Sequence, residues 1–216
     1  MKIPTLQLAL DCSSVEEAIR DCSTGVVDAI DILECGYSLI AAEGARVVKI
    51  MREIYPDKPL LADLKIVDAG NKIGGMLLDG RPDFTTVLCA CEPGTIIAVQ
   101  EEAKKRNLDT KIQIELYGNW SFDDVKVWKE LGVSQLTLQH SGDKPGGWTD
   151  EEIETLKKLC DYGMDVAATG SIGYDDLEKF RGIPVSCFIF GRAIRMAEDP
   201  KAEAMKIKAK INEIWG

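Results

Sequence analysis

The sequence predicts a single-domain (β/α)8 TIM barrel that spans residues 1–216. Three observations predict this fold. Short runs of aliphatic and β-branched residues recur along the whole chain, and each stops at a polar residue or a glycine. Helix signals separate the runs, and such alternation is typical of a parallel sheet. No linker or low-complexity segment divides the chain, which indicates one domain.

The runs number eight, and each has the length of a buried strand. They are LQLALD (6–11), AIDILECG (29–36), PLLADLK (59–65), FTTVLCA (84–90), KIQIELYG (111–118), QLTLQH (135–140), DVAATG (165–170) and SCFIFG (186–191). Eight units favour closure into a barrel. An open doubly wound sheet is the alternative, but no G-x-G-x-x-G follows the first strand to support it.

The segments between the strands carry helix start and stop signals. Four starts have an N-cap residue: Ser14 with Glu17, Ser121, Thr149 with Glu152, and Asp199 with Pro200 behind it. Gly132 and Gly163 follow WKEL and LCDY, where the C-terminus of a helix favours glycine. These signals predict a helix in each connection.

Composition excludes some classes of function. The net charge of −10 disfavours contact with a phosphate backbone, so we expect no nucleic-acid partner. No segment has the length and apolarity of a membrane span, and we expect no membrane partner. The opening MKIPTLQLALD lacks the apolar region and cleavage site of a signal peptide, so we expect a cytoplasmic protein.

Cysteine and histidine counts narrow the chemistry further. The seven cysteines form no C-x-x-C pair and are expected to be reduced and buried, although Cys89 and Cys91 could share a strand face and bind a metal. His140 is the single histidine, which excludes zinc sites built on two or three histidines. No G-x-S-x-G is present to support a Ser-His-Asp triad.

Polar residues gather at the expected strand ends, where barrels of this class form their active sites. In strand order these residues are Asp11, Glu34, Asp63 with Lys65, Glu115, Gln139 with His140, Thr169, and Gly191 with Arg192. Asp11 could instead cap the following helix, and Arg192 could pair with surface acids. The recurrence of ionisable groups at so many ends indicates a site.

Asp63 and Lys65 lie in the stretch LADLKIVDAGN (61–71), which otherwise has the character of a core strand. Their spacing of two predicts that both side chains share one face of the strand. They could form a structural ion pair, but such pairs stabilise weakly because both charges lose their hydration. Several acids around one amine suit a metal ion and an anionic intermediate better.

Two glycine-containing loops follow the seventh and eighth strands. TGSIG (169–173) supplies Thr169, Gly170 and Ser171, and GRAI (191–194) supplies Gly191 and Arg192. Barrels of this class frequently bind phosphate at these loops through backbone amides and a helix N-terminus, and Arg192 would add a charge-assisted contact. Ordinary glycine turns are the alternative.

These motifs together resemble a known family. ALD, DILECG, LADLKIVDAG, IQIELYGNW, TGSI, FIFGRAI and the terminal IWG are similar to segments of the 3-keto-L-gulonate 6-phosphate decarboxylase family. That family is part of the orotidine 5′-monophosphate decarboxylase suprafamily, whose specific motif is D-x-K-x-x-D. The added AG is shared with hexulose 6-phosphate synthase, while Glu115 and Thr169 look more like the decarboxylase.

The resemblance implies a Mg²⁺-dependent homodimer of barrels with shared active sites that acts on a phosphorylated sugar acid. Glu34 and Asp63 match the metal-site acids, and Lys65 matches the lysine that holds the substrate and its enediolate. Asp68 matches an aspartate that reaches into the partner's site. Further matches concern the substrate: Asp11 and Glu115 would position it, and Arg192 and the two loops would hold its phosphate.

The sequence departs from the family in QLTLQHSGDKPGGW (135–148), where the family pattern resembles His-x-x-Arg-Asp. Gln139 stands at the histidine position and Gly142 at the arginine position, and His140 lies one residue later. A shift of one residue turns a side chain to the other face of a strand. Both family residues guide protonation of the enediolate, so the final step is expected to differ.

Three functions fit these observations. The first is decarboxylation of a keto-sugar-acid phosphate such as 3-keto-L-gulonate 6-phosphate, recognised by release of CO₂. The second is an aldol reaction like that of hexulose 6-phosphate synthase, recognised by a requirement for formaldehyde. The third is a non-catalytic barrel that binds a sugar phosphate without turnover.

Overall fold

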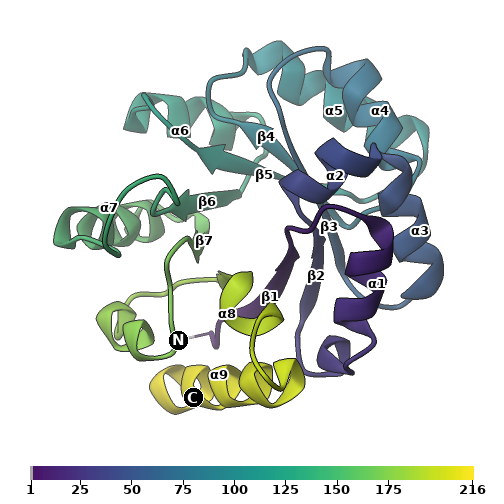
Figure 1. Ribbon diagram of the computed structural model, residues 1–216. Coiled ribbons are helices and arrows are strands. Elements are labelled where there is room, and N and C mark those ends of the chain that lie inside the picture. The colour runs from purple at the N-terminus through teal and green to yellow at the C-terminus, as the bar shows by residue number, and fades with distance from the viewer. Residues whose placement is uncertain (1) are drawn as a thin grey trace.

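Eight parallel strands close into one barrel in the order of the sequence, as the computed structural model of residues 2–216 shows (Figure 1). The strands are β1 (Thr5–Leu10), β2 (Ile32–Cys35), β3 (Leu60–Ile66), β4 (Phe84–Leu88), β5 (Lys111–Leu116), β6 (Gln135–Gln139), β7 (Asp165–Thr169) and β8 (Cys187–Phe190). β1 pairs with both β2 and β8, which closes the sheet. The predicted (β/α)8 barrel is confirmed, and the open sheet is excluded.

Helices connect the strands and surround the barrel (Figure 1). They are α1 (Val15–Cys22), α2 (Tyr37–Glu43), α3 (Arg46–Ile54), α4 (Gly70–Leu78), α5 (Pro93–Lys105), α6 (Phe122–Glu130), α7 (Asp150–Asp161), α8 (Arg192–Arg195) and α9 (Pro200–Trp215), with 3₁₀ turns η1 (Val26–Asp28) and η2 (Asp175–Phe180). Among residues 2–216, no helix is long and apolar enough to cross a bilayer.

The four predicted N-cap residues stand at the starts of α1, α6, α7 and α9, as the sequence predicts. Ser121 and Thr149 each form a complete capping box, and the Asp199 carboxylate accepts the Ala202 N–H ahead of α9. Ser14 caps α1 alone, because the Glu17 carboxylate accepts from Ser13 instead of closing the box. The side chains of these short polar residues thus satisfy amides that a helix N-terminus leaves without partners.

Two connections differ from one helix per strand. The second is divided into α2 and α3 by Gly44, whose φ of +74° ends the first helix. The seventh contains only the 3₁₀ turn η2, in which three of six residues are acidic. The prediction of a helix in each connection is therefore wrong only for the seventh, and the second contains two helices in place of one.

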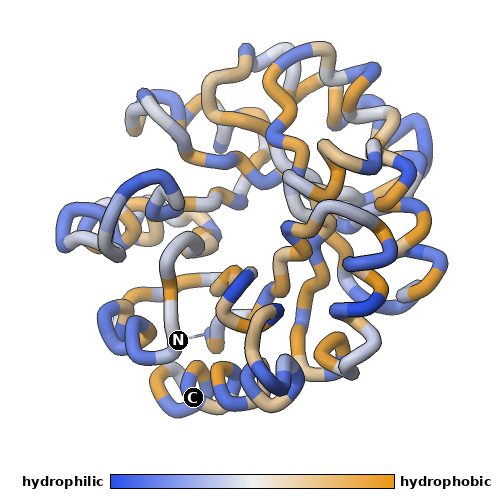
Figure 2. Tube along the Cα trace, in the orientation of Figure 1, coloured by the Kyte–Doolittle hydropathy of each residue, from blue (hydrophilic) through white to orange (hydrophobic). Residues whose placement is uncertain are grey.

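Apolar residues follow the barrel wall and the inward faces of the helices, while the outer helical faces are polar (Figure 2). The barrel interior itself is mixed. Ala9, Ala167, Cys187 and Ile189 form a small apolar cluster there. Buried polar residues accompany them and satisfy one another: Gln113 donates to Thr137 Oγ1 at 2.6 Å. The barrel interior is therefore already polar below the charged residues at the C-terminal ends of the strands.

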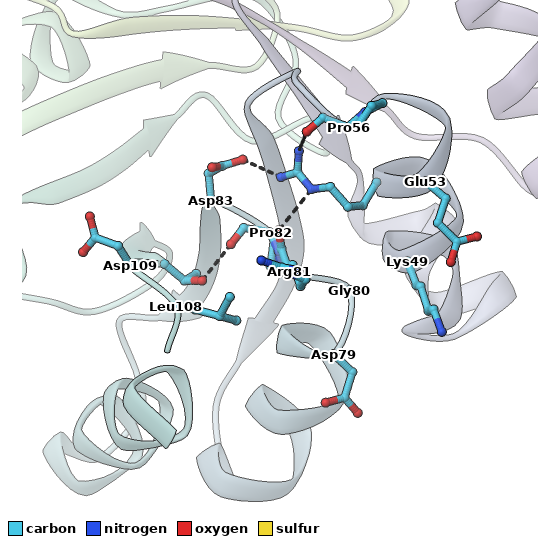
Figure 3. A pocket seen from close by; sticks show the side chains of 12 residues that line it. Lys49, Glu53, Pro56, Asp79, Gly80, Arg81, Pro82, Asp83, Leu108 and Asp109 are labelled. Carbon is cyan, nitrogen blue, oxygen red and sulfur yellow. Dashed lines mark hydrogen bonds and ion pairs between the residues drawn. The ribbon is translucent and has the colours of Figure 1, made fainter. Parts of the chain in front are cut away.

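A cavity of about 660 Å³ lies at the N-terminal ends of β3, β4 and β5 (Figure 3). Arg52 from α3 dominates it. Its guanidinium bonds the Asp83 carboxylate at 2.5 Å and the carbonyl oxygens of Arg81, Pro56 and Lys58 at 2.8–3.1 Å. These bonds connect α3 to the loops that precede β3 and β4, so we assign Arg52 a structural role.

We expect Arg52→Ala to lower the free energy of unfolding by about 1–2 kcal/mol, since it removes a charge-assisted bond to Asp83 and the donor to the part-buried carbonyl oxygen of Lys58. Chemical denaturation measures this loss. Lys49→Ala removes an exposed charge from the same helix and cavity and serves as the control. A change in kcat without a change in stability would contradict a purely structural role.

Candidate active site

Four charged side chains converge at the C-terminal ends of β2, β3 and β5. Glu34, Asp63 and Glu115 are each only 5% exposed. Lys65 lies among them: its Nζ forms an ion pair with Asp63 and stands 3.8 Å from Glu115 Oε2. Three buried carboxylates therefore share one ammonium, and the sequence-predicted acids and amine form one cluster.

The strand-end geometry of Asp63 and Lys65 differs from the sequence prediction. Ala62 pairs with Thr85 and Ile66 pairs with Val87, so residues 63–65 together stand opposite the single residue Thr86. Lys65 has a φ of +50°, in the left-handed region. A bulge, rather than the alternation of a regular strand, thus brings the two side chains together.

Lys65 is held on the remaining sides by an aromatic ring and by charge. Its Nζ stands 5.2 Å from the ring centre of Tyr37, which is half-exposed at the start of α2. Burial lowers the pKa of Lys65, but the carboxylates of Glu115 and Asp63 outweigh burial and raise it above its ordinary value. The ammonium therefore stays charged near neutral pH.

The surplus of negative charge raises the pKa values of the acids in the cluster. Burial, together with the charges of Asp63 and Asp11, holds the pKa of Glu34 well above its ordinary range, although the Gln7 amide donates to Glu34 Oε2 at 2.6 Å. Burial likewise raises the pKa of Glu115 to about 7, against the lowering effect of Lys65. One ammonium does not neutralise this cluster, so it favours a further cation.

Glu34 and Asp63 fit one ligand in particular. Mg²⁺ takes oxygen ligands, usually one or two carboxylates, and fills its other positions with water and substrate oxygens. Among the described residues 2–216, no three His, Cys, Asp or Glu residues are placed to hold a metal unaided. This also excludes Cys89 and Cys91 as part of a protein-only metal cluster, and Cys89 instead bonds the backbone of Tyr117.

Asp11 follows β1 and faces α2. Its Oδ1 accepts from the hydroxyl and amide of Ser38 at 3.1 and 3.4 Å, so it does not cap α1, which Ser14 does. A Cβ at Gly36 would stand 2.5 Å from Asp11 Oδ1, which explains glycine there. The exposed Asp11 carboxylate is thus fixed at the rim of the barrel, next to the buried acids.

The two predicted phosphate loops line one cavity of about 350 Å³. Its wall contains Asp11, Gln139, His140, Gly142, Thr169, Gly170, Ser171, Gly191 and Arg192, among others. Gly170 and Ser171 are consecutive left-handed residues, with φ of +81° and +50°. A Cβ at Gly170 would overlap the carbonyl oxygen of His140, so this position requires glycine.

Arg192 opens the short helix α8 beside this cavity and is exposed. Within residues 2–216 it forms no ion pair, so pairing with a surface acid does not occupy its guanidinium. Arg195, three residues later, is paired: its guanidinium donates to the carboxylates of Glu17 and Asp21 and to the carbonyl oxygen of Asp11. The same short helix therefore carries one occupied arginine and one directed to the cavity rim.

At the end of β6 the side chains of Gln139 and His140 lie in different surroundings. The Gln139 amide donates to Glu115 Oε2 at 3.3 Å, which places it in the charged cluster. His140 is 2% exposed, and its Nδ1 lies 3.0 Å from Glu152 of α7. Its ring thus contacts α7 rather than Gln139 or Glu115. The residue lines the cavity, and its Nε2 is buried with no hydrogen-bond partner within residues 2–216.

Asp68 lies apart from the cluster. It follows β3, is exposed, and precedes the left-handed Ala69 at the start of α4. Exposed apolar side chains occur beside it in the chain and on the next two helices: Val67 is 50% exposed, Met76 on α4 57% and Ile97 on α5 41%. Helices α4 and α5 pack against each other.

Three supporting residues carried no recognisable signal. Gln7, Tyr37 and Thr86 contact Glu34, Lys65 and Asp63, respectively. Gln7 and Thr86 have the sequence context of ordinary strand residues, and Tyr37 that of a helix start. Only the fold places them next to the charged groups.

Comparison with known proteins agrees with this arrangement. Residues 4–207 match the model of the orotidine 5′-phosphate decarboxylase / HUMPS family. The chain is 36% identical over 219 residues to 3-keto-L-gulonate-6-phosphate decarboxylase UlaD of Salmonella paratyphi B, with both chains covered completely. That similarity extends over the whole barrel, including the strand ends.

Solved structures give the same result. A crystal structure of KGPDC from Streptococcus mutans superposes with a TM-score of 0.95 at 33% identity over all of both chains. The 3-hexulose-6-phosphate synthase from Salmonella typhimurium reaches 0.87 at 29% identity and covers 97% of this chain and 99% of its own. The chain belongs to the orotidine 5′-phosphate decarboxylase / HUMPS family.

Proposed function

We propose that the chain is a Mg²⁺-dependent decarboxylase of a keto-sugar-acid phosphate, with 3-keto-L-gulonate 6-phosphate as the first candidate substrate. One observation carries the proposal: a largely buried ammonium pairs with two carboxylates and has a third close by, next to a cavity whose rim holds an arginine without an ion pair in residues 2–216. The names of the relatives support the same reaction. Seven free cysteines suit a reducing compartment, so we propose a cytoplasmic location.

We assign a set of binding residues to each end of the substrate. The phosphate would lie against Gly170, Ser171, Gly191 and Arg192, where backbone amides and a guanidinium suit phosphate oxygens. The keto-acid end would then reach toward Lys65. Asp11 and Glu115, held at their strand ends, would accept hydrogen bonds from sugar hydroxyls. Glu34 and Asp63 would hold the Mg²⁺, which supplies Lewis-acid stabilisation of substrate oxygens.

Loss of CO₂ breaks one C–C bond, and its electron pair moves onto the β-carbonyl to form an enediolate. Lys65 is placed to stabilise that negative charge as it develops, because it remains protonated and is largely removed from water. A proton must then be delivered to carbon. Gln139 can donate a hydrogen bond but cannot act as an acid near neutral pH. The proposed proton sources are therefore water and His140, which lines the cavity and whose buried Nε2 has no partner within residues 2–216.

A screen of keto-sugar-acid phosphates for CO₂ release tests the proposal. CO₂ release from at least one of them is expected. Formaldehyde-dependent product formation without CO₂ release would instead identify an aldolase, the second candidate that the synthase neighbour favours. Binding of a sugar phosphate without any turnover would identify a non-catalytic barrel.

The β6 end provides a sharper prediction. We expect low activity on 3-keto-L-gulonate 6-phosphate, or preference for another substrate, and mixed deuterium labelling at the new C–H bond in D₂O. Gln139→His with Gly142→Arg should raise decarboxylation by roughly 10²-fold and sharpen the labelling, since general acids contribute on this scale. Gly142 has room for the change: a Cβ there meets no atom within 4 Å.

The two single variants separate the contributions of residues 139 and 142. CO₂ release measures the rate, and ¹H NMR of the labelled product, which resolves the two C–H positions, gives the epimer ratio. The prediction fails if the unmodified protein already gives one labelled epimer at about 10 s⁻¹.

A further inference from the structure

Thr86 lies in β4, is 1% exposed, and contacts three successive residues of β3. Its hydroxyl donates to Asp63 Oδ1 at 2.7 Å and accepts the N–H groups of Leu64 and Lys65 at 3.1 and 2.8 Å. A threonine hydroxyl has one donor and two acceptor positions. These three bonds use all of them, and they all end on the bulge that carries the charged pair.

The bulge depends on such a partner. Residues 63–65 stand opposite Thr86 alone, so the amides of Leu64 and Lys65 donate to a side chain rather than to the backbone of β4. Lys65 is also left-handed, a conformation that non-glycine residues keep only when their surroundings hold them in it. Thr86 satisfies both amides and, from the same oxygen, orients the Asp63 carboxylate.

We propose that Thr86 is a positioning residue, whose hydroxyl fixes the Lys65 ammonium and the Asp63 carboxylate in the arrangement that the reaction requires. The proposal rests on the proposed decarboxylase function for its kinetic consequence. Thr86 would not touch the substrate. It acts through Lys65 and Asp63, and a misplacement of about 1 Å in such groups can reduce the rate by about 10²-fold.

The neighbouring residue offers a matched control. Thr85 is also a buried threonine in β4, 0% exposed, and its hydroxyl donates to the carbonyl oxygen of Ala62 at 3.2 Å. Thr85→Val therefore removes a buried hydroxyl from the same strand without touching the bulge. Thr86→Val removes the hydroxyl that holds it, and Thr86→Ser keeps that hydroxyl.

The experiment measures kcat, KM, melting temperature and the exchange of the Leu64 and Lys65 amides by NMR in these variants. Thr86→Val should lower kcat by about 10²-fold and speed exchange at both amides. KM should change little, because the phosphate loops lie on β7 and β8. Thr86→Ser should stay within about threefold of wild-type kcat, as should Thr85→Val.

Equal losses of kcat in Thr85→Val and Thr86→Val, or unchanged exchange in Thr86→Val, would overturn the proposal. If Thr86→Val does not fold, Thr86→Cys provides the comparison, because a thiol is a weak donor and acceptor of similar size. If wild type releases no CO₂ from any substrate, the proposed function fails while amide exchange still decides the role of Thr86 in holding the bulge.

Discussion

Lys65→Ala is expected to reduce kcat by on the order of 10³-fold or more while the barrel still folds. Lys65 is the one ammonium among Glu34, Asp63 and Glu115, so no neighbouring group replaces its charge when the enediolate forms. Steady-state CO₂ release measures the loss. Lys72→Ala, which removes an exposed lysine nearby on α4, is the control. A variant that keeps more than about a tenth of wild-type kcat would contradict this role.

The same variant should also change the pH dependence of stability. Glu115 has a pKa of about 7 in the folded protein and an ordinary value of 4.5, and the Lys65 ammonium keeps the folded value from rising further. Without it the folded pKa lies higher still. Below about pH 4.5 the carboxyl is protonated in both states and costs nothing; as pH rises toward the folded pKa, stability is progressively lost. The deficit of Lys65→Ala relative to wild type should therefore be larger at pH 8 than at pH 5.

Asp68 is expected to act in the active site of a partner subunit, so that two inactive variants restore activity when they are mixed. Hybrids of Lys65→Ala and Asp68→Ala chains would contain one site with both lesions and one with neither. With equal mixing, about a quarter of wild-type activity should return, because half of the dimers are hybrids with one working site. Val67, next to Asp68 in the chain, is a half-exposed apolar side chain of the kind that a subunit contact would cover.

A double variant gives the complementary control. If sites are shared, hybrids of wild type with Lys65→Ala/Asp68→Ala have no working site, and equal mixing leaves about a quarter of the activity. If each site belongs to one chain, about half remains. Native mass spectrometry verifies subunit exchange. Exchange without recovery in the first mixture would contradict a shared site.

Much of this architecture could be predicted because it depends on local signals. Strand runs, caps such as Ser121 and Thr149, and polar strand ends lie within a few residues of the feature that they specify. Parallel strands bring their ends to one rim, so topology predicts that Asp63, Lys65 and Glu115 lie at the same end of the barrel. Gln139 and His140 also separated as strand alternation predicts.

The remainder depends on contacts between distant residues. The bulge at 63–65 arises because the hydroxyl of Thr86, on the next strand, replaces backbone partners, and FTTVLCA carries no sign of this. Gln7 is similarly unrecognisable until β1 and β2 lie side by side. The division of the second helical segment at Gly44 was missed as well, since a glycine permits a left-handed turn without requiring one.

The bulge on β3 lies inside the barrel wall and is held by β4, whereas His140 contacts α7 and the loop after it connects β6 to that helix. Substitutions at the rim can therefore accumulate without loosening the groups that would stabilise the enediolate. A lineage could exchange one sugar phosphate for another, or decarboxylation for aldol chemistry, while inheriting the same electrostatic machinery. Residues 141–147 are therefore the positions to randomise in directed evolution toward new substrates, while the β3–β4 pair is kept unchanged.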